Sequence, residues 1–239
     1  GVMSRAADRA GIHWRTLNAT HGAATQALRA QIDRDLYHAA IVDILGEYEN
    51  LDIVFEAVEN LDIKNTTVNN KYRAGAIVLT TGTFLHGVVT RGQEKISSGR
   101  LQDDGTYQAA DKNISDVLKD AGFELLRLKT GTPARIKKDS IDFSVCEIQP
   151  GDRPHDWFSD GDENNNYDCV CYITHTTQET HQVIRDNIKN APMYNGDIVG
   201  TGPRYCPSLE DKVMRFPEHT SHHVFLEPEG WNSDLIYPN

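Results

Sequence analysis

An apolar run that ends in a small-residue turn restricts the folds open to this chain. Ala76-Ile77-Val78-Leu79 has the composition of a buried strand of a parallel sheet, and Thr80-Thr81-Gly82-Thr83 follows it directly. Parallel strands occur almost only where helices cover the sheet, so strands and helices should alternate along the sequence. That alternation is found up to about residue 135 and predicts the α/β class.

The remaining pattern places the other elements. Apolar spacing and turn residues predict helices over 2–10, 24–48, 113–121 and 178–190, and strands over 51–63, 123–128 and 170–175. Thr176 or Thr177 is expected to cap the last of these helices. Residues 150–168 are polar and rich in Asn, Gly and Pro, which indicates a long surface loop. The residues after about 140 therefore form a part with α+β character.

Composition excludes several classes of protein. The 24 Lys and Arg residues against 35 Asp and Glu give a net charge of −11, so any contact with nucleic acid requires a local basic patch. No apolar run approaches the roughly 20 residues of a membrane span. The four cysteines, Cys146, Cys169, Cys171 and Cys206, are too few for a disulfide scaffold and suggest a reducing compartment. Cys169 and Cys171 lie on one face of the predicted strand, and their spacing does not fit the usual zinc knuckle, so no metal is expected.

Two Thr-Gly-Thr segments are candidate ligand sites. Thr81-Gly82-Thr83 follows the apolar run, where ligands bind in open α/β sheets, although a turn that merely needs a glycine also accounts for it. Thr130-Gly131-Thr132 lies among basic residues, which suits a phosphate cradle and equally a solvated basic loop.

Cys206 lies in the segment GPRYCPSLEDKVMRF, residues 202–216. Arg204 and Lys212 favour the thiolate, and residues 207–211 have the sequence of a helix start, where a thiolate is stabilised. A buried structural cysteine is the alternative.

Several motifs together carry a resemblance to a known family. They occur in the family's order and are TTGTFL (80–85), SGR (98–100), LKTGTPARI (128–136), IDFS (141–144), CYITHT (171–176), GPRYCPSLEDKVMRF (202–216), FLEPEG (225–230) and IYPN (236–239). The chain resembles the GidA/MnmG family over nearly its whole length.

The resemblance implies a Rossmann-like FAD-binding domain, partial here and covering 1–135, with an inserted α+β NADH-binding domain over 136–239. It implies an enzyme that uses FAD, NADH and methylene-tetrahydrofolate to modify C5 of the wobble uridine in tRNA, giving a carboxymethylaminomethyl or taurinomethyl type of group. It further implies a GTPase partner, a homodimer, and a location in the bacterial cytoplasm or the mitochondrial matrix.

The resemblance also implies roles for individual residues. Cys206 would be the catalytic thiolate. FAD would contact Val58 and the Thr81-Gly82-Thr83 turn. NADH would contact Gly202, Pro203, Arg204, Tyr205, Pro207, Ser208 and Lys212. The basic residues Arg91, Arg100, Lys129, Arg135, Lys137 and Lys138 are candidates for tRNA phosphate contact, with surface salt bridges as the alternative.

The sequence also departs from the family pattern. It lacks the G-x-G-x-x-G fingerprint, the family's other functional cysteine and the C-terminal helical domain, which leads us to expect an inactive internal segment of a longer protein. The altered segments SSGR and DDGTY, together with the acidic net charge, leave open a degenerate homologue that acts as a binding or assembly subunit. A flavin oxidoreductase that acts on small molecules is a further alternative.

Overall fold

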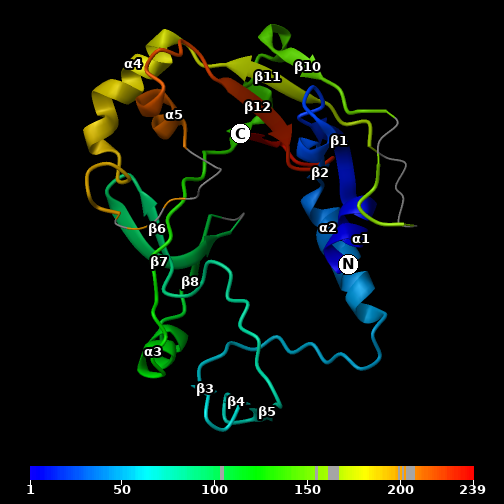
Figure 1. Ribbon diagram of the computed structural model, residues 1–239, viewed down its shortest axis with the longest axis vertical. Coiled ribbons are helices and arrows are strands. Elements are labelled where there is room, and N and C mark those ends of the chain that lie inside the picture. The colour runs from blue at the N-terminus through cyan, green and yellow to red at the C-terminus, as the bar shows by residue number, and fades with distance from the viewer. Residues whose placement is uncertain (103–104, 154–155, 161–166, 199, 201, 203–207) are drawn as a thin grey trace. The chain divides into compact units, whose positions relative to one another are not determined.

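The structure is a computed structural model that describes residues 1–102, 105–153, 156–160, 167–198, 200, 202 and 208–239 (Figure 1). The α-helices are α1 (Val2–Ala10), α2 (Arg34–Gly46), α3 (Asn113–Asp120), α4 (Gln178–Asn187) and α5 (Leu209–Arg215). The strands are β1 (Gly11–Leu17), β2 (Ala27–Ile32), β3 (Leu61–Asp62), β4 (Thr67–Val68), β5 (Tyr72–Arg73), β6 (Val88–Arg91), β7 (Glu94–Leu101), β8 (Tyr107–Ala109), β9 (Ile136–Lys137), β10 (Glu147–Gln149), β11 (Cys171–His175), β12 (His223–Pro228) and β13 (Leu235–Pro238). This mixture of helices and sheets confirms the predicted α/β class.

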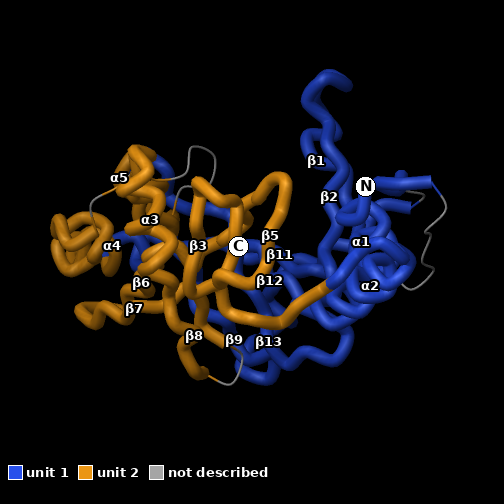
Figure 2. Tube along the Cα trace, turned by 90° about the horizontal axis from the view of Figure 1, so that it is seen from below, with its two compact units in different colours: residues 1–52, 131–182, 216–239 blue, residues 53–130, 183–215 orange. Residues whose placement is uncertain are grey.

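The chain divides into two compact units (Figure 2). Unit 1 consists of residues 1–52, 131–182 and 216–239, and unit 2 of residues 53–130 and 183–215. Each unit therefore takes residues from both sides of residue 135. The assignment of 1–135 to FAD and of 136–239 to NADH stays a prediction. No helix within the described residues is both long and apolar enough to cross a bilayer.

Unit 1 contains a hairpin, a helix pair and an antiparallel sheet. The hairpin pairs β1 with β2, and the five-stranded sheet has the order β10-β11-β12-β13-β9. Helices α1 and α2 lie side by side and bury Ala6 against Ala40 and Ile44 (Figure 1). Ile12 and Trp14 of β1 are fully buried, and the Trp14 ring packs against Trp157 and Phe158 of the polar loop. Cys171, Leu226 and Ile236 are buried apolar residues of the five-stranded sheet.

Unit 2 contains two small antiparallel sheets, β3-β4-β5 and β6-β7-β8, together with α3 and α5. Parallel pairing among the described residues is restricted to one bridge, between Leu85 and Asp111. The Asp111 side chain accepts a hydrogen bond from the backbone of Ile114, which fixes the start of α3.

Local end signals predicted several elements well. Helix α1 ends at Gly11, α3 ends just before Gly122, and β11 occupies most of the predicted strand. Gly122 has a φ of 88°, the left-handed conformation that commonly follows a helix end. Of the two expected caps for α4, Thr177 takes that position and its Oγ1 accepts from the Thr180 amide, while Thr176 is buried against His181. The described residues of the 150–168 loop contain neither helix nor strand beyond Pro150.

The predicted helix over 24–48 is wrong in its first half. Residues 27–32 form strand β2, because their backbone pairs with β1, and α2 starts only after Asp33. The predicted strands over 51–63, 76–79 and 123–128 are also wrong, apart from β3 at Leu61–Asp62. A strand needs a neighbour in the sheet, and no described strand pairs with the rest of these segments, in which Leu128 alone takes part in an isolated bridge. Val78 is accordingly 84% exposed.

Candidate functional site

The Thr-Gly-Thr turn at residues 81–83 has an open backbone surface. The Phe84 amide donates to the Thr81 carbonyl at 3.0 Å, which closes a tight turn, and Gly82 has a φ of 54°. A Cβ at Gly82 would meet nothing within 4 Å, so the outer side of this turn is clear of protein atoms. The prediction of a tight glycine turn is confirmed, and glycine here allows both the left-handed φ and the approach of a ligand to the backbone.

The sheet beneath the turn holds it in place by close backbone contacts. The Thr83 hydroxyl donates to the Gly99 carbonyl in β7. A Cβ at Gly87 would lie 2.4 Å from the Thr83 carbonyl oxygen, and a Cβ at Gly99 would lie 2.3 Å from the Phe84 ring. Only glycine fits either position without displacing the turn or its neighbours.

A buried serine adds to this support. The Ser98 side chain is fully buried, and its Oγ donates to the Gln108 carbonyl and accepts from the Arg100 amide. It thereby stabilises the irregular register between β7 and β8. The altered motif SSGR was evident from the sequence, but the role of the Ser98 hydroxyl was not.

The backbone around Val58 is held by a single asparagine. The Asn69 side chain accepts from the amides of Glu59 and Asn60 and donates to the carbonyl of Ala57. The amide and carbonyl of Val58 itself make no hydrogen bond to any described residue. Val58 therefore presents an adjacent donor and acceptor on a fixed loop, which matches the edge of an adenine ring.

The same asparagine helps to organise the preceding carboxylate. The Asn69 amide donates to Glu56, and the Tyr72 hydroxyl and the Lys71 ammonium donate to it as well. These hydrogen bonds lower the pKa of Glu56 to about 2, and the one from Asn69 has the largest effect. Asn69 was missed by the sequence reasoning. The Asn-Asn pair at 69–70 carried the signal, since asparagine tolerates the left-handed φ values of 52° and 51° found there.

The predicted NADH segment is described only at its two ends. Cys206, with Pro203, Arg204, Tyr205 and Pro207, lies outside the described residues, so its catalytic role stays a prediction. Gly202 is exposed. Ser208 caps α5, as its Oγ accepts from the Asp211 amide at 3.2 Å.

Helix α5 carries acids in its first turn, as predicted, and Lys212 is half-buried. One of these acids, Asp211, accepts a hydrogen bond from the Tyr194 hydroxyl at 2.6 Å. Burial and this hydrogen bond raise the pKa of Tyr194 to about 12. The tyrosine was not among the predicted site residues.

The predicted tRNA-contact residues differ in their exposure and in their hydrogen bonds to other residues of the chain. Arg100 and Lys137 are exposed. Lys129 is half-buried and its Nζ donates to the carbonyl of Ile198 at 3.4 Å. Arg135 donates through Nε to both carboxylate oxygens of Glu229 at 3.0 Å and lies over the Tyr237 ring. Arg135 and Lys137 belong to unit 1, whereas Arg100 and Lys129 belong to unit 2.

Cys169 and Cys171 are packing residues with unreactive thiols. Cys171 is buried and Cys169 is half-buried. Burial, followed by the charge of Glu227, raises the pKa of Cys171 to about 12, and burial also raises the pKa of Cys169. Within the described part of the chain, no group of three His, Cys, Asp or Glu side chains has the geometry to hold a metal ion.

The comparison with protein families decides which family this is. A family model described as glucose inhibited division protein A matches residues 1–239. The chain belongs to the GidA family. Its α/β class is therefore that of the GidA proteins, and the resemblance carried by the motifs is confirmed.

Two solved structures of Aquifex aeolicus GidA are similar over this entire chain. The form I crystal gives 40% sequence identity with a TM-score of 0.86, covering 100% of this chain and 41% of that chain. The form II crystal gives 38% identity with a TM-score of 0.84, covering 100% and 39%. This chain thus spans about two fifths of the length of the GidA proteins it matches.

Proposed function

We propose that the whole protein is an FAD- and NADH-dependent enzyme that modifies C5 of the wobble uridine in tRNA, with methylene-tetrahydrofolate as the one-carbon donor. The observation that carries the proposal is membership of the GidA family over the full chain, together with the retained segment Gly202–Phe216 around Cys206. A GTPase partner and a homodimer belong to the same proposal, as does a cytoplasmic or mitochondrial location.

Two features of the chain support FAD binding by the residues assigned to it. The backbone amide and carbonyl of Val58 make no hydrogen bond within the described part of the chain, and they lie on a loop fixed by Asn69, which suits the adenine edge. Gly82 offers open backbone with no side chain in the way, which suits a phosphate or ribose. FAD, when bound, supplies the electron transfer with NADH that the overall reaction requires.

The chemistry assigned to Cys206 follows from the reactivity of uracil. C5 becomes nucleophilic only when C6 is attacked, and a thiolate is the side chain best suited to a reversible attack. Cys206 would add through Sγ to C6, and the electron pair displaced toward C5 would form the new bond to the one-carbon unit. The bond from that carbon to a folate nitrogen would break at the same time, with its electron pair left on the nitrogen. Removal of the C5 proton and elimination of the Cys206 thiolate from C6 then restore the C5–C6 double bond of uracil. Arg204 and Lys212 would keep the thiol ionised.

The test is the variant Cys206→Ser in the whole protein, assayed for wobble-uridine modification of tRNA. We expect modification to be abolished while flavin absorbance is retained. Retained modification would remove the catalytic role of Cys206. A wild-type protein that purifies without flavin absorbance would instead support the assembly-subunit alternative, and NADH oxidation without tRNA or folate would support a simple oxidoreductase.

A further inference from the structure

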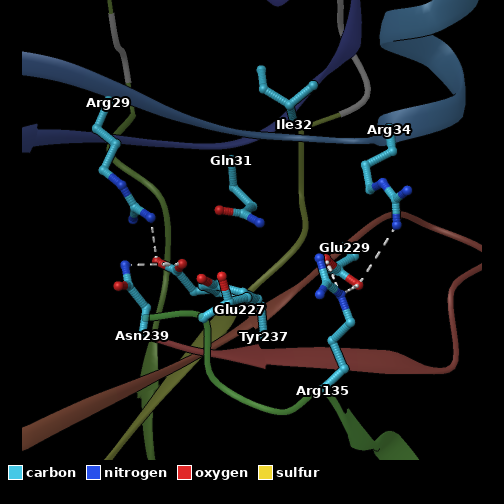
Figure 3. Close-up of a pocket in the computed structure, with 10 residues that line it drawn as sticks. Arg29, Gln31, Ile32, Arg34, Arg135, Glu227, Glu229, Tyr237 and Asn239 are labelled. Carbon is cyan, nitrogen blue, oxygen red and sulfur yellow. Dashed lines mark hydrogen bonds and ion pairs between the residues drawn. The ribbon is translucent and has the colours of Figure 1, made fainter. Parts of the chain in front are cut away.

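An open pocket of about 360 Å³ lies in unit 1, and none of its lining residues is among those assigned to FAD or NADH. One wall is strand β2 with the first residue of α2, and the other is formed by β12, β13 and the segment before β9 (Figure 3). Its lining residues are Arg29, Gln31, Ile32, Arg34, Thr132, Arg135, Glu227, Glu229, Tyr237 and Asn239.

The acidic side chains of this pocket are buried and engaged. Glu227 is 3% exposed and pairs with Arg29, and it also accepts from the Asn239 amide. Glu229 is 9% exposed and pairs with Arg135 and Arg34. A cation in the pocket would therefore meet carboxylates that are covered and already neutralised.

The basic side chains are partly exposed, in contrast to the buried glutamates. Arg29, Arg34 and Arg135 keep 32%, 40% and 39% of their side-chain surface exposed. Three guanidinium groups against two carboxylates leave one net positive charge among the lining side chains. The exposed surface of the pocket is therefore cationic and rich in N–H donors.

These guanidinium groups are also fixed before any ligand arrives. Arg29 is tied to Glu227, and Arg135 is held by two hydrogen bonds to Glu229 and by the Tyr237 ring 5.4 Å away. Figure 3 shows the three guanidinium groups directed toward the buried glutamates from opposite walls. Groups that are ordered in advance lose little entropy when they bind, and a guanidinium fork matches the oxygens of a carboxylate or phosphate.

If the ion pairs served only to join β2 to β12, two arginines would be enough to neutralise the two glutamates. The third arginine and the open volume, which Thr132 and Tyr237 also line, exceed that requirement. We propose that this pocket binds a small oxyanion, either a phosphate group or a carboxylate, through the guanidinium groups of Arg29, Arg34 and Arg135. No lining residue of this pocket is assigned a role in the proposed redox chemistry.

The test is the protection of single arginines from phenylglyoxal in the whole protein, read by mass spectrometry. Inorganic phosphate and acetate serve as the two probes, and sodium chloride of equal ionic strength is the control. We expect protection of Arg29, Arg34 and Arg135 with a midpoint on the order of a millimolar, with Arg5, which pairs with Glu47 in the same unit, unaffected. Protection by phosphate alone or acetate alone identifies the source of the anion.

Two variants separate binding from a structural role. Arg29→Lys keeps the ion pair with Glu227 but loses the fork, so the midpoint for protection of Arg34 and Arg135 should rise about tenfold. Arg5→Lys is the matched control and should leave the midpoint unchanged. Tyr237→Phe keeps the ring under Arg135 and removes only the hydroxyl of this lining residue, so it provides a second folded variant, for which we expect a raised midpoint. No protection beyond chloride, or an unchanged midpoint in both Arg29→Lys and Tyr237→Phe, would overturn the proposal.

Discussion

The buried carboxylate of Asp33 connects the start of α2 to the segment after β12. Substitution of Asp33 should therefore accelerate hydrogen exchange at the three backbone amides that it binds. Its Oδ1 accepts from the amides of Asp35 and Leu36, each at 3.0 Å, which caps α2. Its Oδ2 accepts from the Trp231 amide at 2.8 Å. The side chain is only 6% exposed, so water cannot easily replace it.

The expected magnitudes differ between the two oxygens. Removing a helix cap costs about 1 kcal/mol, and leaving a buried amide without an acceptor costs about 2 kcal/mol. Hydrogen exchange that proceeds by local opening should accelerate about fivefold for 1 kcal/mol and about thirtyfold for 2 kcal/mol. Asp33→Ala should therefore speed exchange at residues 35 and 36 about fivefold and at 231 about thirtyfold.

Asp33→Ser divides the two effects, since a serine caps a helix but is too short to reach Trp231. Exchange should stay near the wild-type rate at 35 and 36 and accelerate at 231. The measurement is hydrogen–deuterium exchange of the whole protein with fragmentation to single amides. Asp142→Ala is the control, because Asp142 makes the same kind of local contact with the Ser144 amide on an exposed turn. Wild-type exchange at 231 in Asp33→Ser, or at 35 and 36 in Asp33→Ala, would refute the assigned contacts.

Three further predictions concern other parts of the chain. Cys171 has a pKa of about 12, raised by burial from 9.0, so its thiolate forms only at strongly alkaline pH. At pH 8 its alkylation by iodoacetamide should be about a thousandfold slower than that of an unperturbed thiol, and labelling of Cys171 as fast as that of Cys146 in the folded protein would contradict its burial. Tyr194, with a pKa of about 12, should stay protonated at pH 11, so Tyr194→Phe should leave the tyrosinate absorbance at that pH unchanged and reduce it only above pH 12. Gly87→Ala should displace the turn at 81–83 because its Cβ would meet the Thr83 carbonyl, destabilising the local structure by about 1–3 kcal/mol and weakening FAD retention. Gly75→Ala, at a site with open space around the Cβ, should retain FAD as the wild type does.

The sequence predicted the elements whose signals are local. Gly11 and Gly122 marked the ends of α1 and α3, and Gly82 marked the turn that it makes. These positions depend on backbone conformations that a single residue imposes. The GidA motifs likewise identified the family, because each is a short contiguous segment that can be recognised without knowledge of the fold.

Elements that depend on distant partners could not be predicted in the same way. Residues 27–32 have a helical apolar spacing, yet pairing with β1 makes them a strand. Residues 76–79 have the composition of a strand, but composition alone does not show whether another strand lies beside them to form backbone hydrogen bonds. The role of Arg135 shows the same limit for the site, because the basic side chain was evident and its partner, Glu229, lies 94 residues later.

The interleaving of the two units has a consequence for synthesis on the ribosome. The backbone passes between the units at residues 52–53, 130–131, 182–183 and 215–216, and the outer strand β9 pairs with β13 about a hundred residues later. At translation rates near 10 residues per second, roughly ten seconds separate the emergence of these two strands. During that interval β9 has no ladder partner, so nascent chains should depend on chaperones until β13 has left the exit tunnel.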